Sequence, residues 1–268
     1  YTTGSYGSND GWQSDYWKGH YSTYIGTLNR VLSDAALYEG RENAEAYARI
    51  WRTYMQTMFT DYFGPAPFPT DPLNYNPDYM PLDELYPILF KELEDAPKLF
   101  DKNVNMLDET NDPFFGGDFT KWKKFANTLR LRMAIKMSEI DPDLCKSQAT
   151  AALKADGGII DSPEYDALSP AYELWGNTYP YQVIGWYVLQ MTSTMEKTLT
   201  GIGGMDFAAT ANHHPAKVDP RATLMFDPSA PYESETFWAG MNPAMSDPGT
   251  LGQRVARMSI SNLRTDGN

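Results

Sequence analysis

Several aromatic residues stand outside the helical periodicity of the chain and next to polar side chains. A pyranose ring offers an apolar C–H face on which an aromatic ring can stack, and hydroxyl groups that bond to amides and carboxylates. The rings are Trp12, Trp175, Tyr179, Tyr181 and Trp238, and their polar neighbours are Asn9, Asp10, Asn177 and Gln182. These residues predict a sugar-binding surface. The alternative for any single ring is that it anchors a long loop by packing inside the protein.

The sequence carries no recognisable catalytic signature. Its histidines are His20, His213 and His214, and no HExxH motif or Cys/His array accompanies them, which disfavours a metal site or a Ser-His-Asp site. Neither GxxxxGK nor a GxGxxG after a strand is found. A glycosidase carboxylate pair has no specific signature among 35 acidic residues. We therefore predict a binding protein without catalytic residues, metal or cofactor, and rank an all-α glycoside hydrolase last among the alternatives.

Length and charge narrow the possible partners. The chain has 268 residues, of which 42% are hydrophobic and 14% aromatic, so it is expected to be an ordered globular protein. A net charge of −13 would repel a phosphate backbone, which makes nucleic acid an unexpected partner. Cys145 is the single cysteine and cannot form an internal disulfide. No stretch approaches the roughly 18 apolar residues of a membrane span.

Helices must position these groups, because apolar residues recur at steps of three and four along much of the first half. Pro81 and Asp118 are expected at two helix starts, and Asp141 at a third. Gly64 and Pro97 are expected to end helices. The predicted helices span residues 17–35, 41–63, 82–93, 118–137 and 142–153. Short connections between neighbours predict antiparallel hairpins.

Most rings on these stripes are predicted to pack a core, and the segments between the helices are predicted to be long loops. The core rings are Tyr47, Trp51, Tyr62, Trp122 and Phe125. The loops cover residues 64–80 and 101–117, a length more often functional than incidental in a compact domain.

Composition changes after Gly158, where Pro, Gly, Ser and Tyr become frequent. We predict a helix-hairpin scaffold over residues 1–158 and a loop-rich subregion over 159–268 packed on it, with one further helix at about 185–199. The fold class is then all-α predominantly, with helix pairs similar to tetratricopeptide repeats and long irregular loops.

Two long runs resemble the SusD/RagB family. Residues 51–68, WRTYMQTMFTDYFGPAPF, resemble its helix and "TDxxGxxPy" turn, and residues 118–132, DFTKWKKFANTLRLR, resemble its "WxKFANSLRLR" helix. Weaker similarity covers the helix from Trp17 to Leu32 and the segment Val218-Asp219-Pro220-Arg221-Ala222. Together these matches cover most of residues 15–225.

The resemblance implies a glycan-binding lipoprotein on the outer surface of the outer membrane of Bacteroidetes. Such proteins are built on tetratricopeptide-like helix pairs, sit as a lid on a TonB-dependent SusC-type transporter, and pass oligosaccharide to it without enzymatic activity. Family members are longer and begin with a lipid-anchored cysteine, so the chain is expected to be an internal fragment whose N-terminal lipid anchor lies outside it. An alternative is an interaction module that docks on the transporter and binds no glycan.

Overall fold

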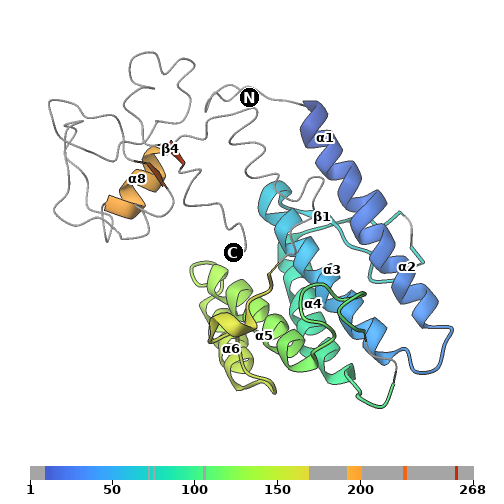
Figure 1. Cartoon of the computed structure of the whole chain (residues 1–268). Helices are drawn as coiled ribbons and strands as arrows, with labels where there is room; N and C mark the ends of the chain where they lie inside the picture. The colour runs from blue at the N-terminus through green and yellow to red at the C-terminus, as the bar shows by residue number, and fades with distance from the viewer. Residues whose placement is uncertain are drawn as a thin grey trace, which may run out of the picture. The chain divides into compact units, whose positions relative to one another are not determined.

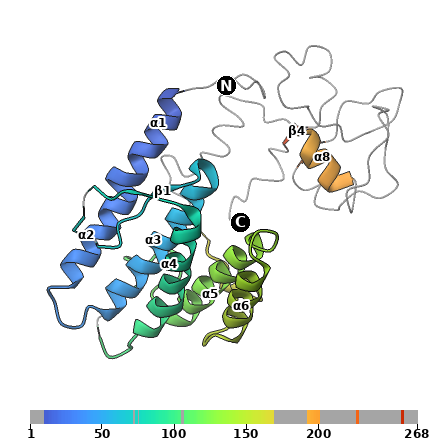
Figure 2. The same cartoon turned by 180° about the vertical axis from the view of Figure 1, so that it is seen from behind.

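The computed structural model describes residues 10–71, 73–74, 76–104, 107–168, 192–200, 226–227 and 257–258. The chain divides into two compact units, residues 10–170 and residues 1–9 with 171–268. The first unit is built of helices that lie side by side in chain order (Figure 1), and the view from behind gives the same order (Figure 2). The predicted all-α fold of successive helix pairs is confirmed.

The first helical run contains a π-helical segment. α1 (Asp10–Gly19), η1 (His20–Ile25) and α2 (Gly26–Ala35) follow one another without a break. His20 and Ile25 are both buried although they are five residues apart, which is the spacing of a π-helix. Tyr24 lies at helical spacing from Tyr21 and Leu28 but is exposed, because the wider turn shifts the periodicity away from 3.6 residues. A Cβ at Gly26 would lie 2.7 Å from the carbonyl oxygen of Tyr21, so glycine suits the end of this segment.

α3 (Glu42–Phe63) returns along α2 and completes the predicted hairpin (Figure 1). Glu42 and Glu45 lie in its first turn, where negative charge complements the helix dipole. Gly64 follows its last residue with a φ of 73°, which favours glycine. A buried hydrogen bond of 2.9 Å from Arg52 Nη1 to Asn29 Oδ1 ties α3 to α2.

The segment between α3 and α4 is closed by a short antiparallel pair. β1 (Ala66–Pro67) pairs with β2 (Tyr79–Met80), with Ala66 opposite Met80. The Tyr21 hydroxyl donates to the carbonyl oxygen of Pro67 at 2.9 Å. Phe68 is buried, and the guanidinium carbon of Arg52 lies over its ring, 4.7 Å from the ring centroid. The predicted long loop therefore has both ends fixed to the helices.

Local signals define the remaining helices of the first unit. α4 (Leu82–Asp95) begins after Pro81 and continues into the 3-10 helix η2 (Ala96–Leu99), so Pro97 lies within η2, beyond the end of α4. α5 (Phe119–Lys136) and α6 (Pro142–Lys154) pack against each other as the next pair. The Asp118 side chain accepts from Thr120 N at 2.8 Å, and the Asp141 side chain accepts from Leu144 N at 2.9 Å. Both predicted N-caps are confirmed.

The hydrophobic core lies where α3, α4 and α5 meet. Trp122 and Tyr47 are buried in it, with their rings 5.1 Å apart, and Trp51 and Phe125 pack against it as predicted. The prediction that Tyr62 is a core ring is wrong. Tyr62 occupies the last turn of α3, where Phe59 and Phe63 form the inner face instead. The buried aliphatic core residues of these helices are Ile50, Leu85, Leu89, Leu93, Ala126, Leu129 and Met133.

The segment of residues 101–117 is held by the buried side chain of Asp112. Its Oδ2 accepts from Trp122 Nε1 at 2.7 Å and from Gly117 N at 2.8 Å. Its Oδ1 accepts from the backbone N–H groups of Phe114 and Phe115, both at 3.2 Å. One carboxylate thus supplies the hydrogen bonds that regular secondary structure would otherwise provide.

Residues 159–168 are joined to α5 and include the 3-10 helix η3 (Pro163–Tyr165). Lys124 Nζ donates to the carbonyl oxygen of Ile159 at 3.0 Å, and Thr128 Oγ1 accepts from Ile160 N at 2.8 Å. The predicted division of the chain at residue 158 stays a prediction. In the second unit the described elements are α8 (Ser193–Thr200) and an antiparallel pair of β3 (Phe226–Asp227) and β4 (Arg257–Met258).

Candidate functional site

Most of the predicted sugar contacts lie outside the described residues. These are Asn9, Trp175, Asn177, Tyr179, Tyr181, Gln182 and Trp238. Asp10 and Trp12 belong to the first turn of α1, so the backbone there is helical and not the loop expected from the sequence; their side chains are not described. The predicted sugar-binding surface stays a prediction, and the structure describes only the helical backbone of α1 at two of its residues.

Two exposed tyrosines lie next to α1. Tyr62 at the end of α3 is 71% exposed and Tyr79 in β2 is 66% exposed. Tyr62 meets Tyr16 of α1 edge to face, with centroids 5.7 Å apart and an interplanar angle of 85°. Tyr79 stacks on Trp17 of α1, with centroids 6.0 Å apart and an angle of 25°. We name Tyr16, Trp17, Tyr62, Phe63 and Tyr79 the aromatic face.

A buried layer fixes the orientation of the aromatic face. Phe63 packs at 5.1 Å and nearly perpendicular to Trp17, and lies 4.6 Å from the buried Phe59. Phe59 in turn stacks on the buried ring of His20 at 3.9 Å. Each exposed tyrosine therefore contacts one half-buried ring of α1, and both of these α1 rings pack on Phe59 and Phe63 of α3. Rings held in this way lose little conformational freedom on stacking with a ligand.

Polar side chains accompany the aromatic face along the sequence. Asp15 and Lys18 flank its α1 residues and are exposed, and the exposed Asp78 precedes Tyr79. Burial, reinforced by the nearby Tyr62, raises the pKa of the Tyr16 hydroxyl above its usual value, so this hydroxyl stays protonated at neutral pH. The arrangement provides apolar rings for stacking and charged or hydroxyl groups for hydrogen bonding.

Sequence reasoning missed the exposed members of the aromatic face. Tyr62 fits a helical stripe by spacing, and its exposure depends on α3 ending at Phe63. Tyr79 lies in a loop that the sequence singled out, but the strand pairing that places it beside Trp17 joins distant residues and leaves no periodic signal. The signal in the sequence is the aromatic residues at the two ends of this loop, Tyr62 and Phe63 before it and Tyr79 near its end.

Within the described part of the chain, no group of three or more His, Cys, Asp or Glu side chains could hold a metal ion. None of the helices among the described residues has the length and apolar character needed to cross a bilayer.

Comparison with known proteins identifies a family and a fold. Residues 2–204 match the SusD-like family described as starch-binding and associating with the outer membrane. A SusD homologue from Parabacteroides distasonis superposes with a TM-score of 0.82 at 30% identity, covering 99% of this chain and 55% of the other. A chitin-binding SusD homologue from Flavobacterium johnsoniae has a TM-score of 0.73 at 22% identity, covering 97% and 52%.

The similarity covers part of each solved relative. A SusD homologue from Bacteroides vulgatus has a TM-score of 0.72 at 19% identity, covering 96% of this chain and 50% of the other. The chain thus spans about half the length of these structures. A search of curated proteins gives no match.

Proposed function

Because the chain belongs to the SusD-like family, whose description is starch-binding and associating with the outer membrane, we propose that it binds oligosaccharide at the cell surface. The bound glycan is passed to a TonB-dependent SusC-like transporter, and the protein acts by binding without catalysing a reaction. A lipid anchor would hold the protein to the outer face of the outer membrane. The sequence resemblance to the SusD/RagB family is confirmed by the family match.

The aromatic face is the observation that carries the proposal. Aromatic residues exposed singly on a surface need no explanation, whereas exposed rings that group with other rings are typical of interaction sites. Tyr62 and Tyr79 lie beside α1, whose first turn contains the predicted contacts Asp10 and Trp12. The exposed rings of α3 and β2 therefore contact the helix that contains these two predicted residues.

The chemistry favours a carbohydrate with exposed C–H faces. Each stacked ring contributes about 1 kcal/mol, so stacking on two to four rings alone gives dissociation constants from about 1 mM to tens of millimolar. Hydrogen bonds to the sugar hydroxyls are expected to lower these values toward the micromolar range. One of the solved relatives is described as a chitin-binding SusD homologue, and the family description names starch. Maltooligosaccharides and chitooligosaccharides are therefore the first ligands to test.

Isothermal titration of the chain with these oligosaccharides, and with a panel of plant and host glycans, tests the proposal. We expect Tyr79→Ala and Tyr62→Ala each to weaken binding about fivefold, which corresponds to the loss of one stacking contact. Trp12→Ala and Trp175→Ala test the sequence-predicted part of the surface in the same way. Tyr38→Ala is the matched control, because Tyr38 is as exposed as Tyr79 but is not part of the aromatic face.

Two outcomes would contradict the assignment. Absence of heat with every glycan would overturn glycan binding and favour a module that only docks on a transporter. Binding that is unchanged in Tyr62→Ala, Tyr79→Ala and Trp175→Ala would overturn the location.

A further inference from the structure

A cavity of about 300 Å³ lies between α4, η2, α5 and α6, away from the aromatic face in the chain order of the helices. Its apolar lining includes Leu93 and Pro97, and no aromatic residue contributes to it. Its polar lining consists of Glu94, Lys98, Lys123, Asn127, Arg130 and Asp156. The volume matches the lower end of small-molecule sites, and the lining differs from a sugar-stacking surface.

Arg130 is the most buried of the cations that line this cavity. Its side chain is 6% exposed, and its Nε donates to Gln148 Oε1 at 2.8 Å. Its Nη2 donates to Glu94 Oε2 at 2.9 Å, while the described residues offer Nη1 no hydrogen-bond partner. A guanidinium binds a carboxylate best through two parallel N–H groups. The present contact with Glu94 uses one of them.

The cations of the cavity are more buried than the carboxylates that neutralise them. Glu94 is 48% exposed against 6% for Arg130, and Asp156 is 86% exposed against 24% for Lys123, whose Nζ lies 2.6 Å from Asp156 Oδ2. An exposed carboxylate keeps much of its hydration and leaves its partner at little cost. A buried cation that loses its anion pays a larger penalty. The two carboxylates are therefore the partners that a ligand anion can displace from Arg130 and Lys123.

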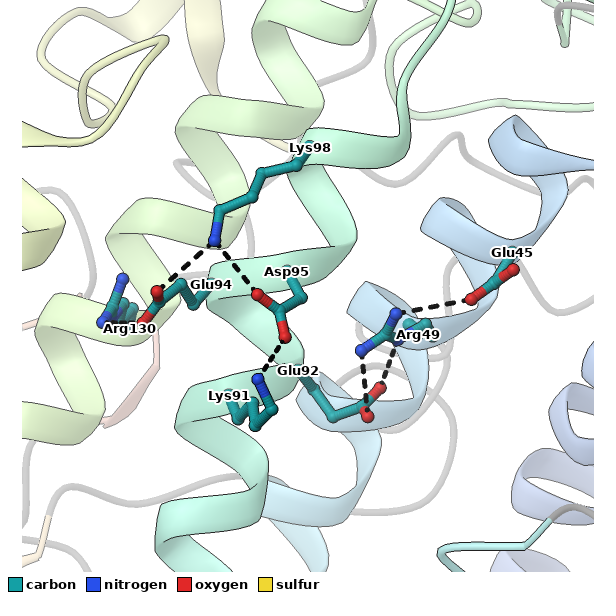
Figure 3. Close-up of polar contacts among 8 residues, drawn as sticks. All are labelled: Glu45, Arg49, Lys91, Glu92, Glu94, Asp95, Lys98 and Arg130. Carbon is teal, nitrogen blue, oxygen red and sulfur yellow. Dashed lines mark hydrogen bonds and ion pairs between the residues drawn. The ribbon is translucent and has the colours of Figure 1, made fainter.

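Glu94 has a second cation available. Figure 3 shows Glu94 between Arg130 of α5 and Lys98 of η2, with Lys98 also reaching Asp95. Lys98 Nζ lies 3.3 Å from Glu94 Oε1 and 3.0 Å from Asp95 Oδ1. Because Glu94 stays paired with Lys98 when it leaves Arg130, a ligand anion can replace it on Arg130 without leaving Glu94 unpaired.

Asn127 also lines the cavity and offers a hydrogen-bond acceptor to a ligand. Its Nδ2 donates to the carbonyl oxygens of Asp156 and Gly158, both at 2.9 Å, which fixes the amide in the wall of the cavity. Its Oδ1 is free of described partners and can accept from a ligand hydroxyl. A carboxylate with hydroxyl groups next to it matches this pairing of cations and an acceptor.

We propose that the cavity binds the carboxylate of a single hexuronic acid residue, with Arg130 and Lys123 holding the carboxylate and Asn127 accepting from a hydroxyl. The carboxylate follows from the charges of the cavity alone, whereas the sugar to which it is attached rests on the proposed glycan-binding function. The site is separate from the aromatic face, so the two can fail independently.

Titration of the full chain with galacturonate, galactose and acetate at neutral pH tests the proposal. We expect galacturonate to bind with a millimolar dissociation constant and galactose at least about tenfold more weakly, because a charge-assisted hydrogen bond is lost. Added salt should weaken galacturonate binding. Equal binding of galactose and galacturonate would overturn the site, and acetate binding as tightly as galacturonate would overturn the sugar part.

Variants locate the binding. Lys123→Gln is expected to weaken galacturonate binding about tenfold. Glu94→Gln is expected to tighten it severalfold, because the competing carboxylate is removed, and damage to the fold cannot mimic a gain in affinity. Lys91→Gln is the control: Lys91 bonds Asp95 on the same helix but does not line the cavity. Unchanged or weaker binding in Glu94→Gln would overturn the proposal, and so would an equal effect of Lys91→Gln.

The variants of the aromatic face separate this site from the proposed function. Tyr62→Ala and Tyr79→Ala should leave galacturonate binding unchanged. If neutral oligosaccharides bind but galacturonate does not, the cavity proposal alone fails. If galacturonate binding depends on Lys123 while neutral glycans produce no heat, the function assigned to the aromatic face alone fails.

Discussion

His20 is a fully buried histidine that helps to support the aromatic face. Its ring stacks on Phe59 at 3.9 Å, and its Nε2 lies 3.1 Å from Gln56 Oε1. Burial lowers the pKa of His20 to about 4, and the hydrogen bond to Gln56 offsets part of that effect. Tyr21, edge to face at 5.0 Å, is the other ring next to it. His20 is therefore neutral in the folded protein at neutral pH.

The protonation of His20 predicts a loss of stability in mild acid. The unfolded chain takes up the proton near pH 6.5 and the folded protein only near pH 4, so the unfolded state is favoured as the pH falls between these values. The expected loss of unfolding free energy between pH 7 and pH 5 is about 2 kcal/mol from this group. Denaturant unfolding at both pH values measures it.

His20→Gln separates this effect from that of other titrating groups. The variant is less stable at pH 7, but its further loss down to pH 5 should be smaller than that of the parent chain by about 2 kcal/mol. Equal losses in the two proteins would contradict a neutral, buried His20.

Residue types allowed some of these roles to be predicted. Trp122 was identified as a core ring from its spacing, and it is buried. The buried role of Asp112 could not be predicted, because a carboxylate in a polar segment between helices is normally solvated. Only the fold brings Trp122 Nε1 to 2.7 Å from it. The prediction that Tyr62 is buried is wrong because its spacing is helical but the helix ends one residue later.

At the level of elements, the segment before α5 depends on a close approach of two backbones. Gly117 has a φ of 81°, donates to Asp112 Oδ2 at 2.8 Å and accepts from the Tyr47 hydroxyl at 3.3 Å. A Cβ at Gly117 would overlap the carbonyl oxygen of Leu107. The glycine is needed for both its conformation and its lack of a side chain.

Gly117→Ala is expected to destabilise the protein by more than about 3 kcal/mol, because backbone strain and a clash with backbone atoms add together. Gly40→Ala is the control: Gly40 has a φ of 72°, but the nearest atoms to its Cβ, on Val104, are 3.8 Å away. The control should cost about 1 kcal/mol. Thermal unfolding followed by circular dichroism compares the two, and equal costs would contradict the clash.

Helix periodicity predicted the elements well and the connections poorly. α3 begins and ends within a residue of its prediction, and the caps of α5 and α6 were read from Asp118 and Asp141. The π-helical segment escaped prediction because an i to i+5 spacing mixes with ordinary helical spacing in a short run. The pairing of β1 with β2 depends on contacts between residues distant in sequence, which periodicity cannot supply.

The candidate site could be predicted less completely than the fold. Stacking rings in irregular segments have no repeat. Only their position outside the helical periodicity and beside polar residues suggested Trp175, Tyr179, Tyr181 and Trp238, and these lie outside the described residues. Tyr79 joins the aromatic face through a strand pair. Sites formed by loops brought together in space require the structure.

For the whole molecule, the core cluster found among the described residues belongs to the first unit. The buried cluster and the partly buried residues that pack on it run from Tyr47 to Ala167. Residues 156–161 bond to buried groups of α5: Asn127 Nδ2 donates to Asp156 O and Gly158 O at 2.9 Å, and Lys124 Nζ donates to Ile159 O at 3.0 Å. The helical unit has the properties of an autonomous domain.

A fragment of residues 10–170 is therefore expected to fold by itself. It should show a helical circular dichroism spectrum and a single cooperative transition within about 5 °C of the first transition of the whole chain, because no described core contact of this unit is removed. A fragment of residues 10–139 is the control. It lacks α6 and the partners of Lys124 and Asn127, leaving buried polar groups unpaired, and should melt at least about 10 °C lower. A broad, non-cooperative transition in the longer fragment would show that its core depends on the rest of the chain.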